Sequence, residues 1–497
     1  MKYVGAIDQG TTSTRFMIFS QDGEVVASSQ VEHKQICPKP GWVEHDPEEI
    51  WRNTVGVIRD GLFKAGIKGS DLESIGITNQ RETIIPFNRK TGQAYHNAIV
   101  WQDLRGTEYV EKLRKVVPDE KFKEITGLTY SPYFSASKIM WLIDNVPRVR
   151  AFLGSEDLVF GTIDTYLTFR LTQGRVVTDM TNASRYMLMN IATGKWDDTM
   201  LEATGIPKVN LPEIVPSMGM IYGLTDPDGP FQVSIPVAGI LGDQQAALFG
   251  EACFTEGESK CTYGTGIFML INTGSRLCRS EHGLLTTIAY QAAGEAPQYA
   301  LEGSVAIAGS LLQWVRDDLE LVGSSREIDQ LAETVPDNGG VYIVPAFSGL
   351  FAPYWRSDAR GIIVGLTRYA RKAHICRAAL EAAAFQANDL KKAMEEDAKV
   401  SIKVLKADGG MTKSMPLMAF QSDIMDIPVV RPRISETTCL GAAFASGLTT
   451  GVWSSIESLR GYWKEEVRWQ PSMDDTERSK KVRYWKKAVE KSFGWAD

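Results

Sequence analysis

Cysteine and histidine are scarce in this chain, and neither forms a cluster along the sequence. Six cysteines are scattered over 497 residues without a CxxC pair, and the five histidines form no close pair. Zinc sites and disulfide frameworks usually show closely spaced cysteines or histidines. We therefore expect reduced, buried thiols, and neither a zinc cluster nor a His-based metal site.

The chain also lacks a long apolar run and an excess of positive charge. No run approaches the ~18 residues of a membrane span, and the N-terminus has no signal-peptide pattern. Lys and Arg total 54 against 61 Asp and Glu, which gives a net charge of −7. Nucleic-acid binders usually carry a basic domain. We expect a cytoplasmic protein with no membrane span and no nucleic-acid partner.

Two common nucleotide-binding motifs are missing as well. The GMTKS segment at 410–414 lacks the GxxxxGK[ST] spacing of a P-loop. No GxGxxG follows a strand, because Gly264-Thr265-Gly266 leads directly into another expected strand. The length of 497 residues and the hydrophobic content of 43% fit a globular enzyme of two or three domains.

The first distinctive stretch is DQGTTSTR at 8–15, which lies between two short apolar runs. This pattern predicts a tight hairpin in which Gly10 allows the turn. Thr11, Thr12 and Ser13 then offer hydroxyls and N–H groups to an anion. Asp8 would repel that anion unless a divalent cation lay between them. An ordinary polar hairpin is the alternative interpretation.

The region that follows predicts alternating strands and helices. A third strand is expected in 21–34, and a helix after Asp46, with Pro47 at its first position. A buried strand at 73–80 then ends in Gln80-Arg81-Glu82-Thr83, which is where open α/β sheets bind ligands. An Arg and a Glu there could serve the hydroxyls of a small polar molecule. A local ion pair explains the same residues equally well.

Other aromatic and polar segments are ambiguous. Trp101 follows an apolar run, and its side chain is expected either to cover the hydrophobic core or to line a ligand-binding site. Tyr133 and Phe134 precede an expected helix, and 178–190 reads as a polar, Asn-rich loop. The apolar run at 234–241 ends in Gly242-Asp243-Gln244-Gln245 before another helix. Asp243 could accept a proton from a substrate hydroxyl there, or simply cap the helix.

The opening pattern recurs in the second half of the chain. TYGTG at 262–266 is again followed by a Phe-Met-Leu strand, so that Gly264-Thr265 matches Gly10-Thr11. Two such hairpins indicate an internal duplication, with the acidic segment 250–258 as the connection between the halves. Facing hairpins could hold one polyphosphate from both sides. Further on, Asp408-Gly409-Gly410 between a strand and a helix would let a nucleotide approach the backbone.

The end of the chain, 476–496, predicts a basic amphipathic helix. Its apolar stripe comprises Val482, Trp485, Val489 and Phe493. Binding to a membrane surface is conceivable, but docking of this helix onto the protein body is the simpler interpretation.

Eight of these segments together resemble the FGGY carbohydrate kinase family, within the actin, hexokinase and Hsp70 ATPase superfold. The segments are DQGTTSTR (8–15), PKPGWVEHDPEEIW (38–51), GITNQRET (76–83), NAIVWQ (97–102), GDQQAALFG (242–250), TYGTG (262–266), APYW (352–355) and ADGG (407–410). The resemblance implies an α/β protein with two ribonuclease H-like, actin-like ATPase domains, whose mixed sheets flank a deep cleft. The implied parts are an N-terminal domain at 1–252, a C-terminal domain at 253–460 and a helical tail at 461–497.

The resemblance also implies ATP-dependent phosphorylation of glycerol to sn-glycerol 3-phosphate. The implied glycerol-binding residues are Arg81, Glu82, Trp101, Tyr133, Asp243, Gln244 and Phe268, with Asp243 as general base. The implied nucleotide-binding residues are Thr11, Thr12, Ser13, Arg15, Thr265, Gly309, Gln313, Gly410 and Ser414. Mg²⁺ would lie near Asp8 and Asp243, through water. A homodimer or homotetramer is expected from the family.

Several positions depart from the family pattern. Ser414 stands where Asn is typical, Asp103-Leu104 replaces Cys-Arg, and Phe351 replaces Gly before APYW. The segment 225–236 lacks the Gly-Thr-Arg of members regulated by fructose 1,6-bisphosphate, and the His phosphorylated in others. We therefore expect neither mode of regulation.

Two further hypotheses compete with phosphorylation of glycerol. One is a kinase of the same family that acts on another polyol or on a ketopentose. The other is an actin-like assembly protein with slow ATP hydrolysis. The cluster of Arg81, Glu82 and Trp101 beside Asp243 has no obvious use in a filament subunit, which disfavours the second.

Overall fold

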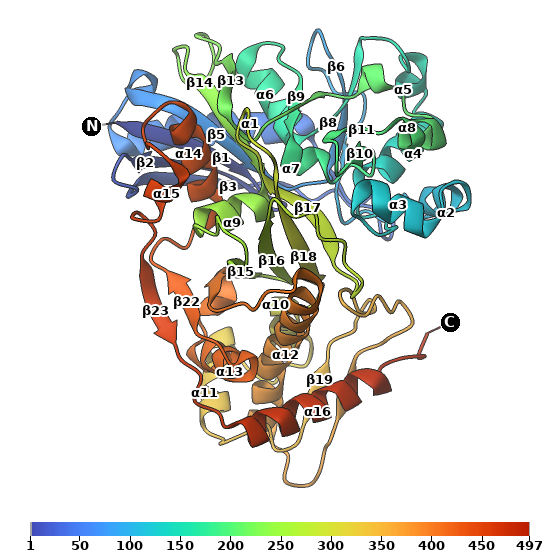
Figure 1. Cartoon of the computed structure of the whole chain (residues 1–497), viewed down its shortest axis with the longest axis vertical. Coiled ribbons are helices and arrows are strands. Elements are labelled where there is room, and N and C mark those ends of the chain that lie inside the picture. Colours follow the sequence, from blue (N-terminus) through green and yellow to red (C-terminus); the bar gives the residue numbers. More distant parts are fainter. Residues whose placement is uncertain (1, 497) are drawn as a thin grey trace.

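The computed structural model describes residues 2–496 and shows two large β-sheets, each with helices packed against it (Figure 1). The first sheet has the strand order β13-β14-β5-β1-β2-β3. Its strands are β1 Tyr3–Gln9, β2 Ser13–Ser20, β3 Val25–Glu32, β5 Leu72–Asn79, β13 Met218–Leu224 and β14 Pro236–Gly242. The first three strands form the expected antiparallel meander, and β1, β5 and β14 run parallel.

The second sheet, in the lower half of Figure 1, has the order β17-β18-β16-β15-β21-β22-β23. Its strands are β15 Ser259–Tyr263, β16 Ile267–Gly274, β17 Leu285–Tyr290, β18 Gln298–Val305, β21 Leu405–Asp408, β22 Val429–Pro432 and β23 Glu465–Trp469. From β18 to β23, the pairings run antiparallel, antiparallel, parallel, parallel and antiparallel. The first sheet shows the same series from β3 to β13. The internal duplication expected from the hairpin repeat is therefore present in the strand topology.

Helix α1, Pro47–Ala65, covers β2 and β3 and begins as the sequence predicts. The Asp46 carboxylate accepts a hydrogen bond from the Glu48 N–H at 2.9 Å, and Pro47 is the first helical residue. Ile50, Val57, Ile58 and Leu62 are buried on the side of the helix that packs against the sheet.

Helix α14, Thr437–Thr449, departs from the domain boundaries expected from sequence order. It lies within 253–460, yet it packs against β5, β14 and α9 of the first half. Glycines make this close approach possible: a Cβ on Gly441 would lie 1.9 Å from the backbone oxygen of Ala246, and one on Gly76 would lie 2.1 Å from that of Ala442. The C-terminal half therefore contributes a helix to the core around the first sheet.

The end of the chain is built into the second half and does not form a separate helical tail. Strand β23 pairs with β22, and α16, Asp475–Lys491, packs against α13 and β19. Trp485 is 1% exposed, and its Nε1 donates to the Asp389 carboxylate at 2.7 Å. Docking onto the protein body is therefore confirmed for this helix. Asp497, with Met1, lies outside the described residues.

The remaining elements surround the two sheets. A four-stranded sheet, β4-β7-β6-β8, lies beside the first one, and three two-stranded sheets are β10-β11, β12-β9 and β19-β20. These strands are β4 Glu44–His45, β6 Ile84–Asn88, β7 Ala98–Ile99, β8 Leu158–Thr162, β9 Val177–Asp179, β10 Met189–Asn190, β11 Lys195–Trp196, β12 Glu213–Val215, β19 Tyr342–Val344 and β20 Ile362–Val364. The remaining α-helices are α2 Thr107–Val116, α3 Asp119–Thr126, α4 Ser135–Asn145, α5 Pro147–Ala151, α6 Ile163–Thr172, α7 Met180–Ala183, α8 Asp198–Thr204, α9 Asp243–Gly250, α10 Gly309–Gln313, α11 Ser325–Glu333, α12 Lys372–Ala398, α13 Met415–Met425 and α15 Ile456–Leu459.

The segment 178–190 corrects one sequence interpretation. The sequence predicts a polar loop here, but the segment contains the end of β9, helix α7 and strand β10, and all its residues before Asn190 are buried. The Asp179 carboxylate accepts N–H bonds from Thr181 and Asn182, so the polar residues satisfy one another inside the protein. Polarity here marks a buried hydrogen-bond network.

Among residues 2–496, no helix is long and apolar enough to cross a membrane. The six cysteines are all free: Cys37 is exposed, and the other five are buried, as expected for reduced thiols.

Candidate active site

The turn between β1 and β2 is ordered by contacts at its own base. The Gly10 N–H donates to the Ser13 carbonyl at 2.9 Å, and Trp101 Nε1 donates to the Thr11 hydroxyl at 2.9 Å. Arg15, on β2, forms an ion pair with Glu436 at the start of α14. The structure thus places Trp101, expected at a different subsite, directly against the hairpin.

Asp8 lies at the end of β1 beside this turn. Burial raises the pKa of its carboxyl to about 6, opposed by the Arg15 charge and reinforced by the Asp243 charge. Among the described residues, no group of three or more His, Cys, Asp or Glu side chains could hold a metal. A pair of carboxylates, Asp8 and Asp243, fits Mg²⁺, which keeps several waters and takes phosphate oxygens as ligands.

Arg81 is the centre of a buried ionic network at the end of β5. It is 2% exposed, and its guanidinium pairs with Glu302 at 2.6 Å and with Asp243 at 3.1 Å. A longer hydrogen bond of 3.4 Å runs from Arg81 to the Tyr133 hydroxyl. Because three partners hold its position, Arg81 can present a fixed donor to a ligand beside Asp243.

Glu82 belongs to the same network through a residue that the sequence analysis did not single out. Its carboxylate accepts from Arg185 Nε at 2.6 Å, and Arg185 also contacts Glu302 at 3.3 Å. Glu82 has a positive φ of 60°, an uncommon conformation for a side-chain-bearing residue. The four charges of Arg81, Arg185, Glu82 and Glu302 therefore balance in pairs inside the protein.

Glu302 and Arg185 were both missed at the sequence level. Glu302 is the one acid in the largely apolar strand β18, and a charge within such a strand is a signal that could have identified it. Arg185 lies in the segment interpreted as a loop. Their pairing joins residues 117 positions apart, which no local pattern reveals.

Asp243 is the first residue of α9, at the strand-to-helix corner that the sequence predicts. Its side chain remains 29% exposed, and burial nevertheless raises its pKa, opposed by the charges of Arg81 and Lys260. Lys260, on β15, was also missed by the sequence analysis. Its Nζ donates to the Gln244 side-chain oxygen and to the Thr262 hydroxyl. Lys260 thus links the second sheet to Gln244 beside Asp243.

Aromatic residues surround this polar centre. The rings of Trp101 and Tyr133 meet edge to face with centroids 5.4 Å apart. Phe268, on β16, is half-buried and lies across from Thr262 of the neighbouring strand. This strand register places Phe268 beside Thr262, which accepts a hydrogen bond from Lys260.

A second cavity, of about 820 Å³, lies between the turn of the second hairpin and helices α10, α11 and α13. Its lining brings together five residues expected to bind nucleotide: Thr265, Gly309, Gln313, Gly410 and Ser414. A cavity of this size can enclose most of a nucleoside. The sequence positions 265 to 414 meet here because β15 and β21 are adjacent and parallel.

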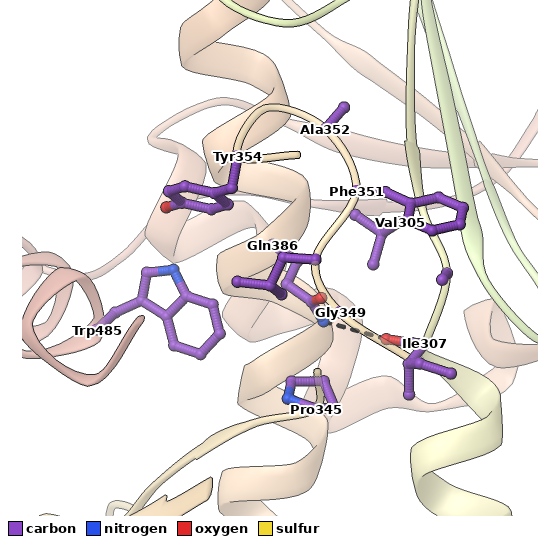
Figure 2. Close-up of a pocket in the computed structure, with 11 residues that line it drawn as sticks. Val305, Ile307, Pro345, Gly349, Phe351, Ala352, Tyr354, Gln386 and Trp485 are labelled. Carbon is purple, nitrogen blue, oxygen red and sulfur yellow. Dashed lines mark hydrogen bonds between the residues drawn. The ribbon is translucent and has the colours of Figure 1, made fainter. Parts of the chain in front are cut away.

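The APYW motif, 352–355, lies in the loop between β19 and β20. A small cavity of about 10 Å³ lies under the loop that carries Ala352 and Tyr354. Figure 2 shows Tyr354 and Trp485 on one side of it and Val305 and Ile307 on the other. Gln386 spans it by donating to the Ile307 carbonyl at 3.2 Å. A cavity of this volume holds no more than one water. The Tyr354 hydroxyl donates to Asp389 of α12, which also accepts from Trp485 of α16, so this residue of the motif packs the loop onto both helices.

Three departures from the family pattern have structural partners. The Asp103 carboxylate is fully buried, pairs with Arg105 at 2.8 Å and accepts the Val43 N–H at 2.6 Å. Phe351 stacks on Trp355 with ring centroids 5.8 Å apart. The Ser414 hydroxyl donates to Asp329 at 2.6 Å and accepts the Leu417 N–H at the start of α13. Ser414 thus lines the cavity with a hydroxyl that already has partners.

Comparison with known proteins identifies curated relatives along the full length of the chain. The chain is 53% identical over 500 residues to "Glycerol kinase" of Chloroflexus aurantiacus, covering 100% of both chains. It is 53% identical over 499 residues to "Glycerol kinase 2" of Streptomyces avermitilis, covering 99% of this chain and 97% of the relative.

Solved structures show the same architecture. The crystal structure of Plasmodium falciparum glycerol kinase with ADP matches with a TM-score of 0.93 and 40% identity, covering 99% of this chain and 98% of that one. A xylulose kinase from Lactobacillus acidophilus matches with a TM-score of 0.86 but only 22% identity, which shows the shared fold alone.

Two family models match the two halves of the chain in order. The N-terminal domain of the FGGY family of carbohydrate kinases matches residues 3–250, and the C-terminal domain of that family matches residues 259–449. The unmatched residues 251–258 coincide with the acidic connection between the halves. The two-domain α/β kinase fold expected from the sequence is thus confirmed, and this chain belongs to the FGGY family of carbohydrate kinases.

Proposed function

We propose that this chain transfers the γ-phosphoryl group of ATP to a terminal hydroxyl of glycerol, giving sn-glycerol 3-phosphate. The observation that carries the proposal is the placement of Asp243 at the head of α9, 3.1 Å from the buried Arg81 guanidinium. The curated relatives at 53% identity over the full chain support the choice of substrate.

Glycerol offers three hydroxyls and a short carbon chain, and the site supplies matching groups. Arg81 donates, Glu82 accepts, and the Gln244 amide is directed by Lys260. Because Lys260 occupies the amide oxygen, the NH₂ group of Gln244 is left to donate to a substrate hydroxyl. Trp101, Tyr133 and Phe268 provide apolar surface for the carbon chain. Each of these contacts to glycerol is part of the proposal.

Asp243 would accept the proton of the attacking hydroxyl. Burial disfavours its charged form, whereas the charges of Arg81 and Lys260 favour it. A raised pKa makes the Asp243 carboxylate a stronger proton acceptor than a free aspartate side chain. Most of the rate acceleration in phosphoryl transfer comes from positioning and charge stabilisation.

ATP would span the two halves of the protein. Thr11, Thr12, Ser13 and Arg15 would hold phosphates from the first hairpin, and Thr265 from the second. The adenosine would occupy the cavity lined by Gly309, Gln313, Gly410 and Ser414. Mg²⁺, held through water near Asp8 and Asp243, would neutralise charge on the phosphates. Binding of glycerol and removal of its proton would depend on Arg81, Glu82, Gln244 and Asp243, as described above.

A coupled assay of ADP release across a substrate panel tests the choice of glycerol. We expect kcat/KM for glycerol to exceed that for erythritol, xylulose and ribulose by at least about 100-fold, because a site built for three hydroxyls leaves polar groups unpaired or crowded with other ligands. Equal or higher kcat/KM for xylulose would instead support a ketopentose kinase of the same family.

Replacing Lys260 with methionine should move the pH dependence of activity. The positive charge of Lys260 lowers the pKa of Asp243, so its removal raises that pKa. A base must be deprotonated, and the acid limb of the kcat/KM profile should therefore shift to higher pH. Profiles from pH 5 to 9 measure this shift, with Lys260→Arg expected to stay close to the wild type. Lys112→Met, at an exposed pair with Glu108, is the matched control. An unmoved acid limb in Lys260→Met would contradict the assigned coupling.

A further inference from the structure

All four carbonyls of the first hairpin turn accept hydrogen bonds from protein groups. The Gly10 carbonyl accepts from the Gln9 and Gln80 side chains, and the Thr11 carbonyl accepts from the Gln35 side chain. The Thr12 carbonyl accepts from the His33 N–H, and the Ser13 carbonyl accepts from the Gly10 N–H. Within residues 2–496, no hydrogen bond uses the N–H of Thr11 or Thr12. The turn therefore keeps its carbonyl oxygens engaged with the protein and the Thr11 and Thr12 amides free, an arrangement that favours an anion.

Two glutamines in this set are held by the same residue, His45. Gln35 Nε2 donates to the Thr11 carbonyl at 2.9 Å, and its Oε1 lies 2.8 Å from His45 Nε2. Gln80 Nε2 lies 3.2 Å from both the Gly10 carbonyl and His45 Nδ1. His45 thus contacts one glutamine with each ring nitrogen, from strand β4 behind the hairpin.

These contacts require a neutral ring with a defined tautomer. Gln35 presents an oxygen to Nε2, so Nε2 carries the hydrogen, and Gln80 presents an N–H to Nδ1, so Nδ1 accepts. His45 is fully buried, and burial together with the neighbouring His33 lowers its pKa to about 3. The two histidine rings meet edge to face at 4.5 Å, although they are twelve positions apart in sequence. The ring stays neutral throughout the physiological range.

We propose that His45 is a positioning residue of the phosphate-binding hairpin, which orients the Gln35 and Gln80 amides so that they hold the Thr11 and Gly10 carbonyls away from the polyphosphate. If either peptide unit turned over, its carbonyl would face the phosphates and repel them. The N–H of the same peptide unit would then point away from the phosphates. The identification of the anion as the ATP polyphosphate rests on the proposed function. The hydrogen-bond relay, which runs from His45 through Gln35 and Gln80 to the two carbonyls, rests on the geometry alone.

A purely structural role for His45 predicts a different outcome. A buried histidine that only fills space would lower the free energy of unfolding when replaced, without changing the affinity for nucleotide in the folded fraction. The relay predicts a loss of nucleotide affinity and a much smaller effect on glycerol, since none of the residues assigned to glycerol accepts or donates to His45.

Three variants separate the two ring nitrogens. His45→Asn can keep an acceptor toward Gln80, His45→Gln can keep a donor toward Gln35, and His45→Phe keeps neither. The readouts are the Kd of Mg·AMP-PNP by calorimetry, the KM values for MgATP and glycerol, and the Tm. We expect the nucleotide Kd and the MgATP KM to rise about 5- to 10-fold in Asn and Gln variants, the factor for one neutral hydrogen bond. The Phe variant should lose more, with the glycerol KM within about twofold of the wild type.

The control is His374→Phe, because His374 is equally buried at 1% exposure but lies in α12 of the second half. It should lower the Tm without raising the nucleotide Kd. A folded His45→Phe variant with wild-type nucleotide Kd and KM would overturn the proposal, as would a rise confined to the glycerol KM. If His45→Phe does not fold, the Asn and Gln variants decide. If the wild type binds Mg·AMP-PNP but does not phosphorylate glycerol, the proposed function is wrong. The nucleotide Kd values of the His45 variants would still test the relay in that case.

Discussion

Replacing Asp243 with asparagine is expected to lower kcat at saturating glycerol and MgATP by about 10²- to 10⁴-fold, the usual contribution of a general base. The asparagine keeps the shape of the side chain and an oxygen for the Gln244 N–H, which Asp243 Oδ1 accepts at 2.7 Å. It loses the negative charge that pairs with Arg81 and the ability to take a proton. The loss should therefore appear in kcat more than in the KM for either substrate.

The control for this substitution is Asp60→Asn, at an exposed ion pair with Lys64 on α1. That variant should retain wild-type kcat. Steady-state kinetics by coupled ADP release measure both, with Tm values to confirm folding. An Asp243→Asn enzyme within about threefold of wild-type kcat would show that the proton acceptor is another group. Asp8, whose carboxyl has a pKa of about 6, would be the next residue to test.

Removal of Glu302 should be the most destabilising single change in the site. Glu302→Ala leaves the Arg81 and Arg185 guanidinium groups buried without their shared partner, and breaking such a pair typically costs about 3–5 kcal/mol. The control is Glu327→Ala, because its pair with Lys372 spans 3.4 Å at the surface and should contribute less than about 1 kcal/mol. Urea titration measures both. Equal, small losses for the two variants would contradict the buried-network account.

The same network gives a pH dependence with a definite sign. The Arg185 and Arg81 charges outweigh burial and lower the pKa of Glu302 to about 2, against an ordinary value of 4.5. Because the folded pKa is the lower one, the stabilisation is present above pH 4.5 and is lost as pH falls toward 2. The difference in unfolding free energy between wild type and Glu302→Gln should therefore narrow across this range. A difference that stays constant with pH would contradict the assigned ionisation of Glu302.

Local patterns were enough to predict several parts of the fold and the site. The Asp46-Pro47 start of α1, the two Gly-Thr hairpins and the position of Asp243 at a strand-to-helix corner each depend on a few consecutive residues. The equivalence of the two hairpins also predicted the duplicated sheet topology. The shared role of Thr265 and Gly410 was implied only by the family resemblance, and the structure brings them into one cavity because β15 and β21 are adjacent and parallel.

The parts that sequence reasoning missed depend on contacts between distant segments. Glu302 pairs with Arg185 and Arg81, which come from segments far away in the sequence. The segment that contains Arg185 is polar, and its polarity predicts a loop where the structure has buried residues. Helix α14 can pack against the first sheet and α9 because Gly76 and Gly441 allow close contact between backbones. A glycine in the sequence does not indicate which segment will pack against it. His33 and His45 meet only because β3 and β4 lie near the same turn. Burial and pairing of polar residues were therefore the hardest features to predict.

The most direct measurement of the central claim is ³¹P NMR of the wild-type chain incubated with glycerol, ATP and Mg²⁺. We expect one equivalent of glycerol 3-phosphate for each ADP formed, with inorganic phosphate at background level, because the proposed function has Asp243 and the Arg81 network position the glycerol hydroxyl in place of water. ADP accompanied by stoichiometric inorganic phosphate, or no turnover without another polyol or sugar, would contradict the assignment of glycerol as the phosphoryl acceptor.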